Sequence, residues 1–311
     1  MIPAITSDEF HGYFVRGSTK GPSMIIVTGA TGALNGSTVE HLLEALPASE
    51  IAIVARDAAK AAAFAIRGVE LRTGDYADRA SLPAAFAGAD QLLLVSASDP
   101  HADAVALHRN AVEAAVEVGV GRVLYTSHQG AARNTPFGPG RDHEATERLL
   151  AASGLPLTSL RNGFYAHSLT WFLGDWRETG VITVPSDGPV SWTAREDAAV
   201  AAARILLSDG AHDGPTTLTA PTAPTFADVA AIAADVAGRP VETTVIGDDD
   251  WVAHQVSSGQ PEFMARFMLD MYRAAADGFF AGTDPLLGEI LGREPRSVRD
   301  LLTTQPITTT Q

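Results

Sequence analysis

The chain has 311 residues, and its apolar fraction of 46% suffices for a buried core in one large domain or two lobes. A formal charge of −15 repels nucleic-acid phosphates, and the absence of cysteine excludes disulfides, thiolate zinc sites and a cysteine nucleophile. No apolar stretch approaches the roughly 20 residues that span a bilayer. We therefore expect a cytoplasmic protein that binds a small molecule, and neither nucleic acid nor a membrane.

Residues 1–23 lack the basic start, the apolar middle and the small-residue cleavage site of a signal peptide. Their Gly17, Ser18, Gly21 and Pro22 are typical of a linker. We interpret residues 1–23 as a leader or flexible extension and Met24 as the natural start.

Short apolar runs alternate with helical patterns from residue 24 to residue 127. The runs occupy residues 24–28, 51–55, 69–73, 91–96 and 122–127. Strands that are apolar throughout are typical of a parallel sheet covered on both faces. Since right-handed crossovers join such strands, the pattern predicts an α/β fold with a doubly wound parallel sheet of the Rossmann type.

Beyond residue 130 the alternation weakens. We expect helices over residues 141–153, 193–207, 226–237, 248–273 (interrupted at 257–261) and 297–302, and strands over 157–160 and 216–220. We expect a first domain over residues 24–160 and a second part over residues 161–311. Segments at about 191–220 are expected to return to the first domain.

The sequence TGATGAL, residues 28–34, joins the first strand to the first helix. Gly29 permits a tight turn, and Gly32 has no Cβ to block a ligand. A loop that merely uses glycines is the alternative, but its place at the start of a βαβαβ pattern favours a pyrophosphate at the helix N-terminus. The usual third glycine is replaced by Asn35, with Gly36 beside it, so the helix start is expected to be slightly displaced. The predicted cofactor contacts here are Gly29, Ala30, Thr31, Gly32, Ala33 and Leu34.

The residue after the second strand determines whether the site prefers NAD or NADP(H). Arg56 suits the 2′-phosphate of NADP(H), whereas Asp57, one place later, argues for NAD. We favour NADP(H); a solvated surface charge at Arg56 is the alternative.

Two further strand ends are expected to border the dinucleotide. Asp75 and Tyr76 follow the third strand and are expected beside the adenine, although Asp75 can instead cap the next helix. The nicotinamide ribose is expected to border the end of the fourth strand, at Ser96, Ala97 and Ser98.

Five short motifs occur together in one order: TGATGAL, Arg56, GDY at residues 74–76, YTS at 125–127 and LRNGFY at 160–165. On these motifs the chain, over roughly residues 24–302, resembles the NmrA-like group of atypical short-chain dehydrogenases/reductases, in the branch of type-2 quinone oxidoreductase and triphenylmethane reductase. The resemblance implies that residues 24–160 form an NADP-binding Rossmann domain, that residues 161–311 form a smaller C-terminal α/β lobe, mainly for substrate, and that a cleft lies between them. It also implies that Tyr165 and Arg195 touch the cofactor and that Asn162 and Tyr165 face its nicotinamide end. Alternatively, Asn162 forms a turn with Gly163 and Tyr165 belongs to the core.

Typical short-chain dehydrogenases carry a Tyr-x-x-x-Lys pair, in which the lysine lowers the pKa of the tyrosine. The corresponding helix reads RDHEATERLL, with His143 and Glu147 at that spacing. His143 can supply a proton near neutral pH, but an exposed His–Glu pair is the interpretation we favour. Loss of the tyrosine–lysine pair favours hydride delivery to conjugated acceptors, which need no strong acid. Trp171, Phe172 and Trp176 either line an aromatic acceptor pocket or pack in the core.

The leading hypothesis is an NADPH-dependent oxidoreductase that reduces a quinone-like or other conjugated aromatic acceptor, with Asn162, Tyr165 and His143 as candidate catalytic residues. The alternative is a non-catalytic NADP(H)-binding redox sensor of the NmrA type, which would act on a protein partner. A third possibility is an epimerase or reductase of another atypical subgroup. No metal is expected, because the nine histidines show no clear ligand spacing.

Overall fold

The computed structural model of the chain describes residues 23–97, 99, 102–208 and 210–304. Ser98, a predicted cofactor contact, and all but the last residue of the predicted leader lie outside the described residues.

Seven parallel strands form the central sheet, in the order β3-β2-β1-β4-β5-β6-β8. The strands are β1 (Ile25–Thr28), β2 (Ile51–Ala55), β3 (Glu70–Thr73), β4 (Gln91–Leu94), β5 (Val123–His128), β6 (Leu157–Asn162) and β8 (Gly214–Leu218). The predicted doubly wound Rossmann-type sheet is confirmed. Its strand order reverses between β1 and β4, which is where such sheets bind dinucleotides.

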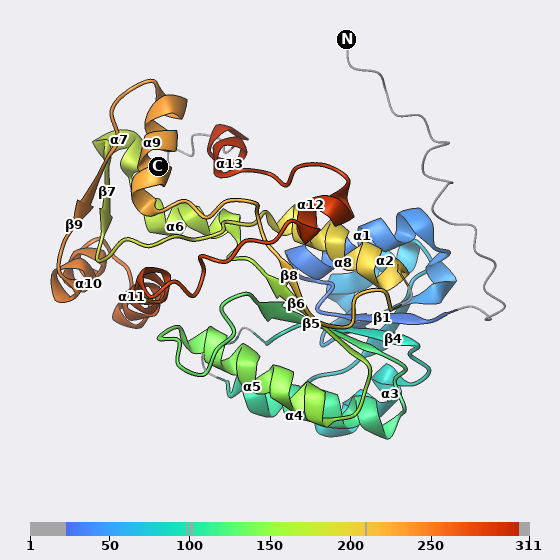
Figure 1. Cartoon of the computed structure of the whole chain (residues 1–311). Coiled ribbons are helices and arrows are strands. Elements are labelled where there is room, and N and C mark those ends of the chain that lie inside the picture. Colours follow the sequence, from blue (N-terminus) through green and yellow to red (C-terminus); the bar gives the residue numbers. More distant parts are fainter. Residues whose placement is uncertain (1–22, 98, 100–101, 209, 305–311) are drawn as a thin grey trace, which may run out of the picture.

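Helices cover both faces of this sheet (Figure 1). On one face lie α3 (Leu82–Phe86), α4 (Ala104–Glu117) and α5 (Gly138–Ala152), and on the other α1 (Ala33–Ala45), α2 (Ala62–Ile66), α8 (Arg195–Leu207) and α12 (Leu286–Leu291). Side chains alternate between the two cores: Ile25 and Val27 of β1 pack toward α1 and α8, and Ile26 packs toward α3 and α4. Burial on both faces explains why β1 and β2 are apolar at every position except Thr28.

The second part of the molecule contains a small parallel sheet of two strands, β7 (Val181–Val184) and β9 (Glu242–Val245). Around it lie α6 (Leu169–Leu173), α7 (Trp176–Thr179), α9 (Phe226–Ala237), α10 (Asp248–Ser257), α11 (Glu262–Ala276) and α13 (Val298–Thr304). Short 3-10 helices are η2 (Ala48–Glu50), η3 (Ala58–Ala61), η4 (Arg79–Ser81) and η5 (Ala166–Ser168). Phe172 and Trp176 are buried in the core of this part, whereas Trp171 is 64% exposed, so core packing, the second of the two alternatives, describes Phe172 and Trp176 but not Trp171.

Between these two parts the chain passes more than once. After the 3-10 helix η5 and strand β7, it returns to the sheet, where α8 packs against α1 and β8 extends the sheet beside β6. It then leaves again for α9, β9, α10 and α11. The division into domains at residue 160 stays a prediction.

Several element ends differ from the sequence expectation. The helix expected from residue 193 begins at Arg195, the strand expected over 216–220 runs over Gly214–Leu218, and β6 extends to Asn162. The strands β7 and β9 and the helices α6, α7 and α12 had no counterpart among the predicted elements.

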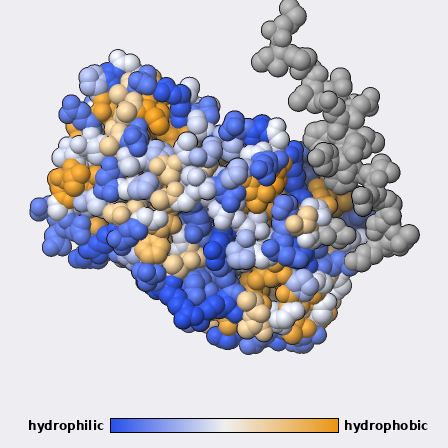
Figure 2. Space-filling view, viewed as in Figure 1, coloured by the Kyte–Doolittle hydropathy of each residue, from blue (hydrophilic) through white to orange (hydrophobic). Residues whose placement is uncertain are grey.

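Hydrophilic residues cover most of the face shown in Figure 2, and apolar residues gather there only in small clusters. Within the described ranges, no helix is both long enough and apolar enough to cross a membrane.

Candidate active site

The turn between β1 and α1 has the geometry expected of a phosphate-binding turn. Gly29 has a positive φ of 67°, and a Cβ added there would lie 2.6 Å from Cγ1 of Val95. The amide of Gly32 donates to the carbonyl of Gly29 at 2.9 Å and closes the turn. Because Gly32 is the N-cap and has no side chain, no side chain caps the first-turn N–H groups of α1, which remain available to an anion.

The third close approach in this turn is made by Gly36. A Cβ on Gly36 would lie 2.8 Å from the carbonyl oxygen of Ala30. Asn35 is buried, and its Nδ2 donates to the carbonyl of Thr28 at 2.8 Å, which fastens the helix to the end of β1. The helix starts at Ala33, so the motif is lengthened by one residue between its second and third glycines.

Arg56 follows β2 directly and is exposed. Its guanidinium has no hydrogen-bond or ion-pair partner that the described residues supply. The carboxylate of Asp57 accepts the amide of Ala59 at 3.0 Å and caps the 3-10 helix η3. Asp57 is therefore already engaged in a local turn, which weakens the argument for NAD that its position suggested.

Asp75 and Tyr76 have different surroundings. Asp75 Oδ1 accepts the amide of Ala77 at 3.0 Å, so its carboxylate forms a local turn and does not cap a helix. Tyr76 Oη donates to Thr28 Oγ1 at 2.7 Å, and Thr28 Oγ1 accepts the amide of Val95 at 2.8 Å. Tyr76 thus lies against the ends of β1 and β4, and burial raises the pKa of its phenol.

The loop after β4 is held by hydrogen bonds to side chains of β5 and α4. The amide of Ser96 donates to Thr126 Oγ1 at 2.9 Å, and the amide of Ala97 donates to His108 Nε2 at 2.7 Å. Since Nε2 accepts, the proton of a neutral His108 is on Nδ1, which lies 2.8 Å from Thr146 Oγ1. Burial lowers the pKa of His108 to about 4, which keeps the ring neutral. The sequence assigned no role to His108, although a histidine within an otherwise apolar helix face was a signal for one.

At the end of β6, Asn162 and Tyr165 meet. Asn162 is buried, and its Nδ2 donates to Tyr165 Oη at 3.1 Å, whereas its Oδ1 has no partner in the described part of the chain. Burial raises the pKa of Tyr165 to about 12, although the bond to Asn162 and the charge of Arg195 oppose it. The ring of His167 stacks on that of Tyr165, with 5.8 Å between the ring centroids. Arg195 Nη1 lies 3.5 Å from His167 Nε2. The structure therefore brings these predicted residues together at one strand end.

His143 and Glu147 do not form the exposed pair that we favoured. His143 Nδ1 lies 2.9 Å from Tyr125 Oη, and its ring stacks on His128 at 6.0 Å. Burial, with help from the neighbouring histidines, lowers the pKa of His143 well below its usual range. A neutral imidazole is a poor acid, so proton donation by His143 near neutral pH has no support here. Glu147 instead contacts Ser127 and Arg161.

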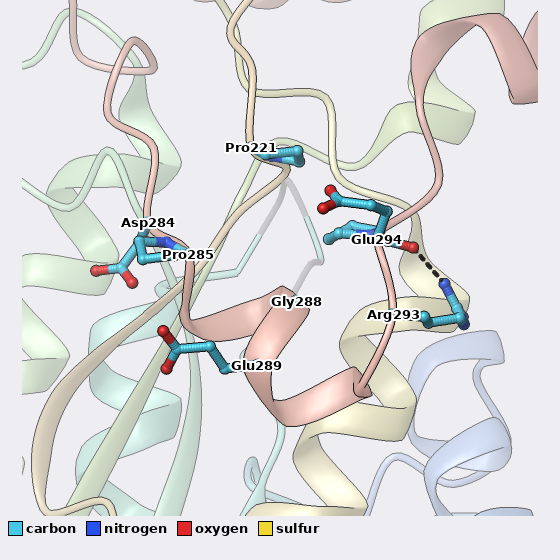
Figure 3. A pocket seen from close by; sticks show the side chains of 8 residues that line it. Pro221, Asp284, Pro285, Gly288, Glu289, Arg293 and Glu294 are labelled. Atoms are coloured by element: carbon cyan, nitrogen blue, oxygen red, sulfur yellow. Dashed lines mark hydrogen bonds between the residues drawn. The ribbon is translucent and has the colours of Figure 1, made fainter.

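Two surface cavities lie away from these strand ends. One of about 390 Å³, shown in Figure 3, is lined by Pro221, Asp284, Pro285, Gly288, Glu289, Arg293, Glu294 and Pro295. The other, of about 280 Å³, lies between α4 and α5. Neither is lined by a predicted site residue. The described residues contain no group of three or more His, Asp or Glu side chains that could hold a metal ion.

Comparison with known proteins identifies the family. The model of the NmrA-like family matches residues 21–287. The chain belongs to the NmrA-like family. The resemblance seen in the sequence is thus confirmed for this NmrA-like protein.

Curated relatives of this NmrA-like chain above 30% identity include a quinone oxidoreductase and an azoreductase. Quinone oxidoreductase 2 of Escherichia coli (strain K12) is 35% identical over 271 residues, which cover 86% of this chain and 94% of the relative. NAD(P)H azoreductase of Xenophilus azovorans is 32% identical over 275 residues, which cover 88% and 95%.

Solved structures agree with these sequence matches. The crystal structure of the E. coli NADPH-dependent quinone oxidoreductase in complex with NADPH has a TM-score of 0.84 at 33% identity, and the match covers 90% of this chain and 99% of that chain. Triphenylmethane reductase of Citrobacter sp., complexed with NADP(H), has a TM-score of 0.81 at 32% identity, with coverage of 89% and 98%.

Proposed function

We propose that this NmrA-like protein is an NADPH-dependent oxidoreductase that delivers hydride to a quinone-like or other conjugated aromatic acceptor. One observation carries the proposal: an open glycine turn at the β1–β4 switch point lies one strand away from Arg56, whose guanidinium is free to bind a phosphate. The relatives named above, a quinone oxidoreductase, an azoreductase and a triphenylmethane reductase, support the same class of acceptor.

The residues around the turn fit NADPH. The first-turn amides of α1, between Gly32 and Leu34, would hold the pyrophosphate, and Arg56 would hold the 2′-phosphate. Asp75 and Tyr76 would border the adenine side. The fastened loop at Ser96 and Ala97 would border the nicotinamide ribose. When bound, the cofactor supplies the hydride.

Near the acceptor end of the site, neither Tyr125 of β5 nor His143 of α5 is an acid of useful strength at neutral pH. Burial raises the pKa of Tyr125 and lowers the pKa of His143, so the phenol keeps its proton and the imidazole has none to spare. A reduced quinone is a stabilised anion that can take its proton from water, whereas an alkoxide needs an acid beside it. Asn162 and Tyr165 would orient the acceptor. Arg195, which contacts His167, would lie at the outer side of this end of the site.

A direct assay tests this proposal. The purified protein is mixed with NADPH and a panel of benzoquinones, naphthoquinones and triphenylmethane dyes, and the nicotinamide absorbance is followed. We expect turnover with several of these acceptors, slower turnover with NADH, and none with simple aliphatic ketones. Equal affinity for NADPH and NADP⁺ without turnover of any acceptor would contradict the proposal.

That contrary outcome would favour the second candidate, a redox sensor that binds NADP(H) and a protein partner. The observation in its favour is the same shortage of proton donors near neutral pH. A cytoplasmic location is part of either proposal and awaits a localisation experiment.

A further inference from the structure

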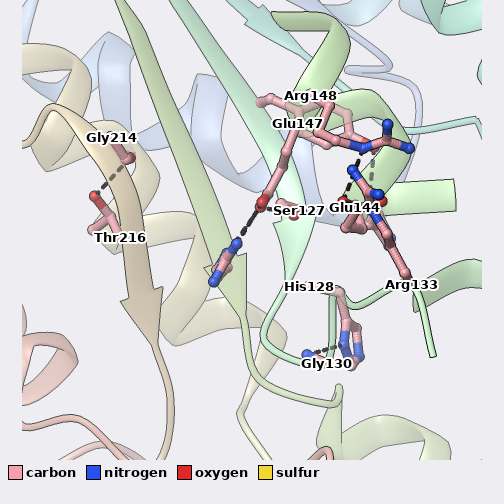
Figure 4. A network of polar contacts seen from close by, with 12 residues as sticks. Ser127, His128, Gly130, Arg133, Glu144, Glu147, Arg148, Gly214 and Thr216 are labelled. Carbon is pink, nitrogen blue, oxygen red and sulfur yellow. Dashed lines mark hydrogen bonds and ion pairs between the residues drawn. The ribbon is translucent and has the colours of Figure 1, made fainter. Parts of the chain in front are cut away.

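One carboxylate on α5 bonds two neighbouring strands of the sheet at once. Glu147 Oε1 accepts from Ser127 Oγ of β5 at 2.6 Å and from Arg161 Nε of β6 at 2.9 Å. Glu147 Oε2 accepts from Arg161 Nη2 at 2.5 Å, which makes the contact to the guanidinium bidentate. Figure 4 shows the Glu147 side chain reaching from the helix to both strands.

The bridge made by Ser127, Glu147 and Arg161 lies one residue pair before the ends of β5 and β6, beside the candidate site. Ser127 and Arg161 are paired across β5 and β6, and the next pair in register is His128 with Asn162. The amide of Gln129 then donates to the carbonyl of Asn162 at 2.9 Å, where the strands separate. Any movement of the Ser127–Arg161 pair would therefore move Asn162 directly.

The surroundings of the bridge distinguish it from an ordinary surface ion pair. The side chain of Glu147 is 11% exposed and that of Arg161 30%, and the hydrogen bond that Arg161 donates to Glu147 raises the pKa of Arg161. Glu144, on the same helix, offers the contrast. It pairs with Arg133 and Arg148, whose side chains are 68% and 56% exposed, and among the described residues it makes no hydrogen bond or ion pair to either strand.

Glu147 also occupies the place at which Tyr-x-x-x-Lys enzymes carry their lysine, four residues after His143. A lysine there would add a cation that acidifies the neighbouring hydroxyl. Here a carboxylate paired with a guanidinium adds none, so Glu147 does not acidify a hydroxyl in this way but contacts the strand ends.

We infer that Glu147, given the proposed hydride transfer on which this role rests, is a positioning residue: it locks the ends of β5 and β6 together and thereby fixes Asn162 beside the nicotinamide end. A misplacement of an orienting group by about 1 Å can cost up to about 100-fold in rate.

Three variants test the inference: Glu147→Ala, Glu147→Gln and Glu144→Ala. With NADPH and a quinone that the wild type reduces, we expect Glu147→Ala to lower kcat about 10–100-fold while the Kd for NADPH changes less than about threefold, because the glycine turn and Arg56 are untouched. Glu147→Gln should recover part of the loss, since its amide oxygen can still accept from Ser127. Glu144→Ala should keep the wild-type kcat.

A kcat within about twofold of wild type in folded Glu147→Ala, or an equal loss in Glu144→Ala, would overturn the inference. Should Glu147→Ala fail to fold, Glu147→Gln carries the comparison, with the expectation of a reduced kcat at unchanged NADPH affinity. If the wild type reduces no acceptor, the proposed function fails separately. The bridge is then tested by the nicotinamide fluorescence of bound NADPH, which should differ between Glu147→Gln and wild type and be unchanged in Glu144→Ala; identical emission in all three would refute the role.

Discussion

The amide of Ala97 donates a hydrogen bond of 2.7 Å to Nε2 of His108, so a buried helix residue holds the loop that follows β4. The other ring nitrogen lies 2.8 Å from Thr146 Oγ1, which itself donates to the carbonyl of Asp142 at 2.8 Å. This chain of bonds links α4 and α5 to the loop and fixes the tautomer of the ring.

Replacing His108 should therefore loosen the nicotinamide side of the cofactor site. In His108→Phe the ring volume is kept but the acceptor for Ala97 is lost, which leaves a part-buried amide without a partner at a cost of about 1–3 kcal/mol. We expect the Kd for NADPH to rise about 3–10-fold, because part of that cost weakens the bound state relative to the free protein. Fluorescence titration measures it, and a Kd equal to wild type would contradict the assigned role.

Stability should fall as the pH drops below neutrality. Burial lowers the pKa of His108 and of His128 to about 4 and lowers that of His143 well below its ordinary range. The unfolded state, with histidine pKa values near 6.5, then binds more protons than the folded state between about pH 6.5 and 4. The stability contributed by neutral histidines is thus fully present above pH 6.5 and is lost toward pH 4.

Urea denaturation at intervals from pH 7.5 to 5 checks this sign. Each histidine with a depressed pKa adds a slope that approaches about 1.4 kcal/mol per pH unit below its unfolded value. A free energy of unfolding that stays constant over this range, before the carboxylates titrate, would show that the rings are not neutral in the folded protein.

Arg56 should govern the choice between the two reduced dinucleotides. In Arg56→Gln the charge-assisted bonds to the 2′-phosphate are lost, and the Kd for NADPH should rise about 10–100-fold, while that for NADH stays within a factor of about two. Arg109→Gln serves as the control, because Arg109 is also exposed and has no recorded partner within the described ranges, but lies on α4. Isothermal titration of all three proteins with both cofactors decides the matter; equal losses for NADPH and NADH in Arg56→Gln would remove this assignment.

Substitutions of Gly29 and Gly88 distinguish the cost of backbone strain from the cost of a steric clash. Both have positive φ, at 67° and 74°, but a Cβ on Gly29 would meet Val95 at 2.6 Å, whereas one on Gly88 would meet nothing within 4 Å. We expect Gly88→Ala to cost about 1–2 kcal/mol of unfolding free energy and Gly29→Ala to cost about 1–3 kcal/mol more. Only Gly29→Ala should also weaken NADPH binding. Equal losses of unfolding free energy in the two variants would mean that the Val95 side chain moves aside at no energetic cost.

Asn162 should affect the chemical step more than cofactor affinity. Asn162→Ala removes the amide that contacts Tyr165 at the end of β6, and we expect kcat with a quinone to fall about tenfold or more at an almost unchanged Kd for NADPH. Tyr165→Phe is the companion variant, since it removes the Oη that the amide contacts. Steady-state kinetics at saturating NADPH measures both, and an unchanged kcat in Asn162→Ala would exclude it from the reacting end.

The sheet could be predicted because its strands are buried on both faces. The runs at Ile51–Ala55 and Ile25–Thr28 are apolar at every position but one, and glycines and Pro47 mark where the helices between strands stop. The strands β7 and β9 could not be predicted in this way. Each has four residues, Glu242–Val245 is mostly polar and exposed, and neither carries a periodic signal long enough to distinguish it from a loop.

The site shows the same division. The glycine turn could be predicted because its residue types follow from backbone geometry at one place in the chain. Helical spacing placed His143 and Glu147 on one face, but it cannot tell whether that face meets water or the sheet; here it meets Tyr125 and Ser127. The link between Ala97 and His108 depends on how deeply α4 packs against β4, which no local pattern encodes.

The return of the chain to the sheet through α8 and β8 limits how the protein can be divided. A fragment that stopped near residue 160 would lack Ala201, Ile205 and Leu206, which cover α1, and would leave the last strand with an open edge. We expect such a truncated product to aggregate, and the intact chain to unfold as one cooperative unit in which loss of the outer layer also dismantles the nucleotide-binding half.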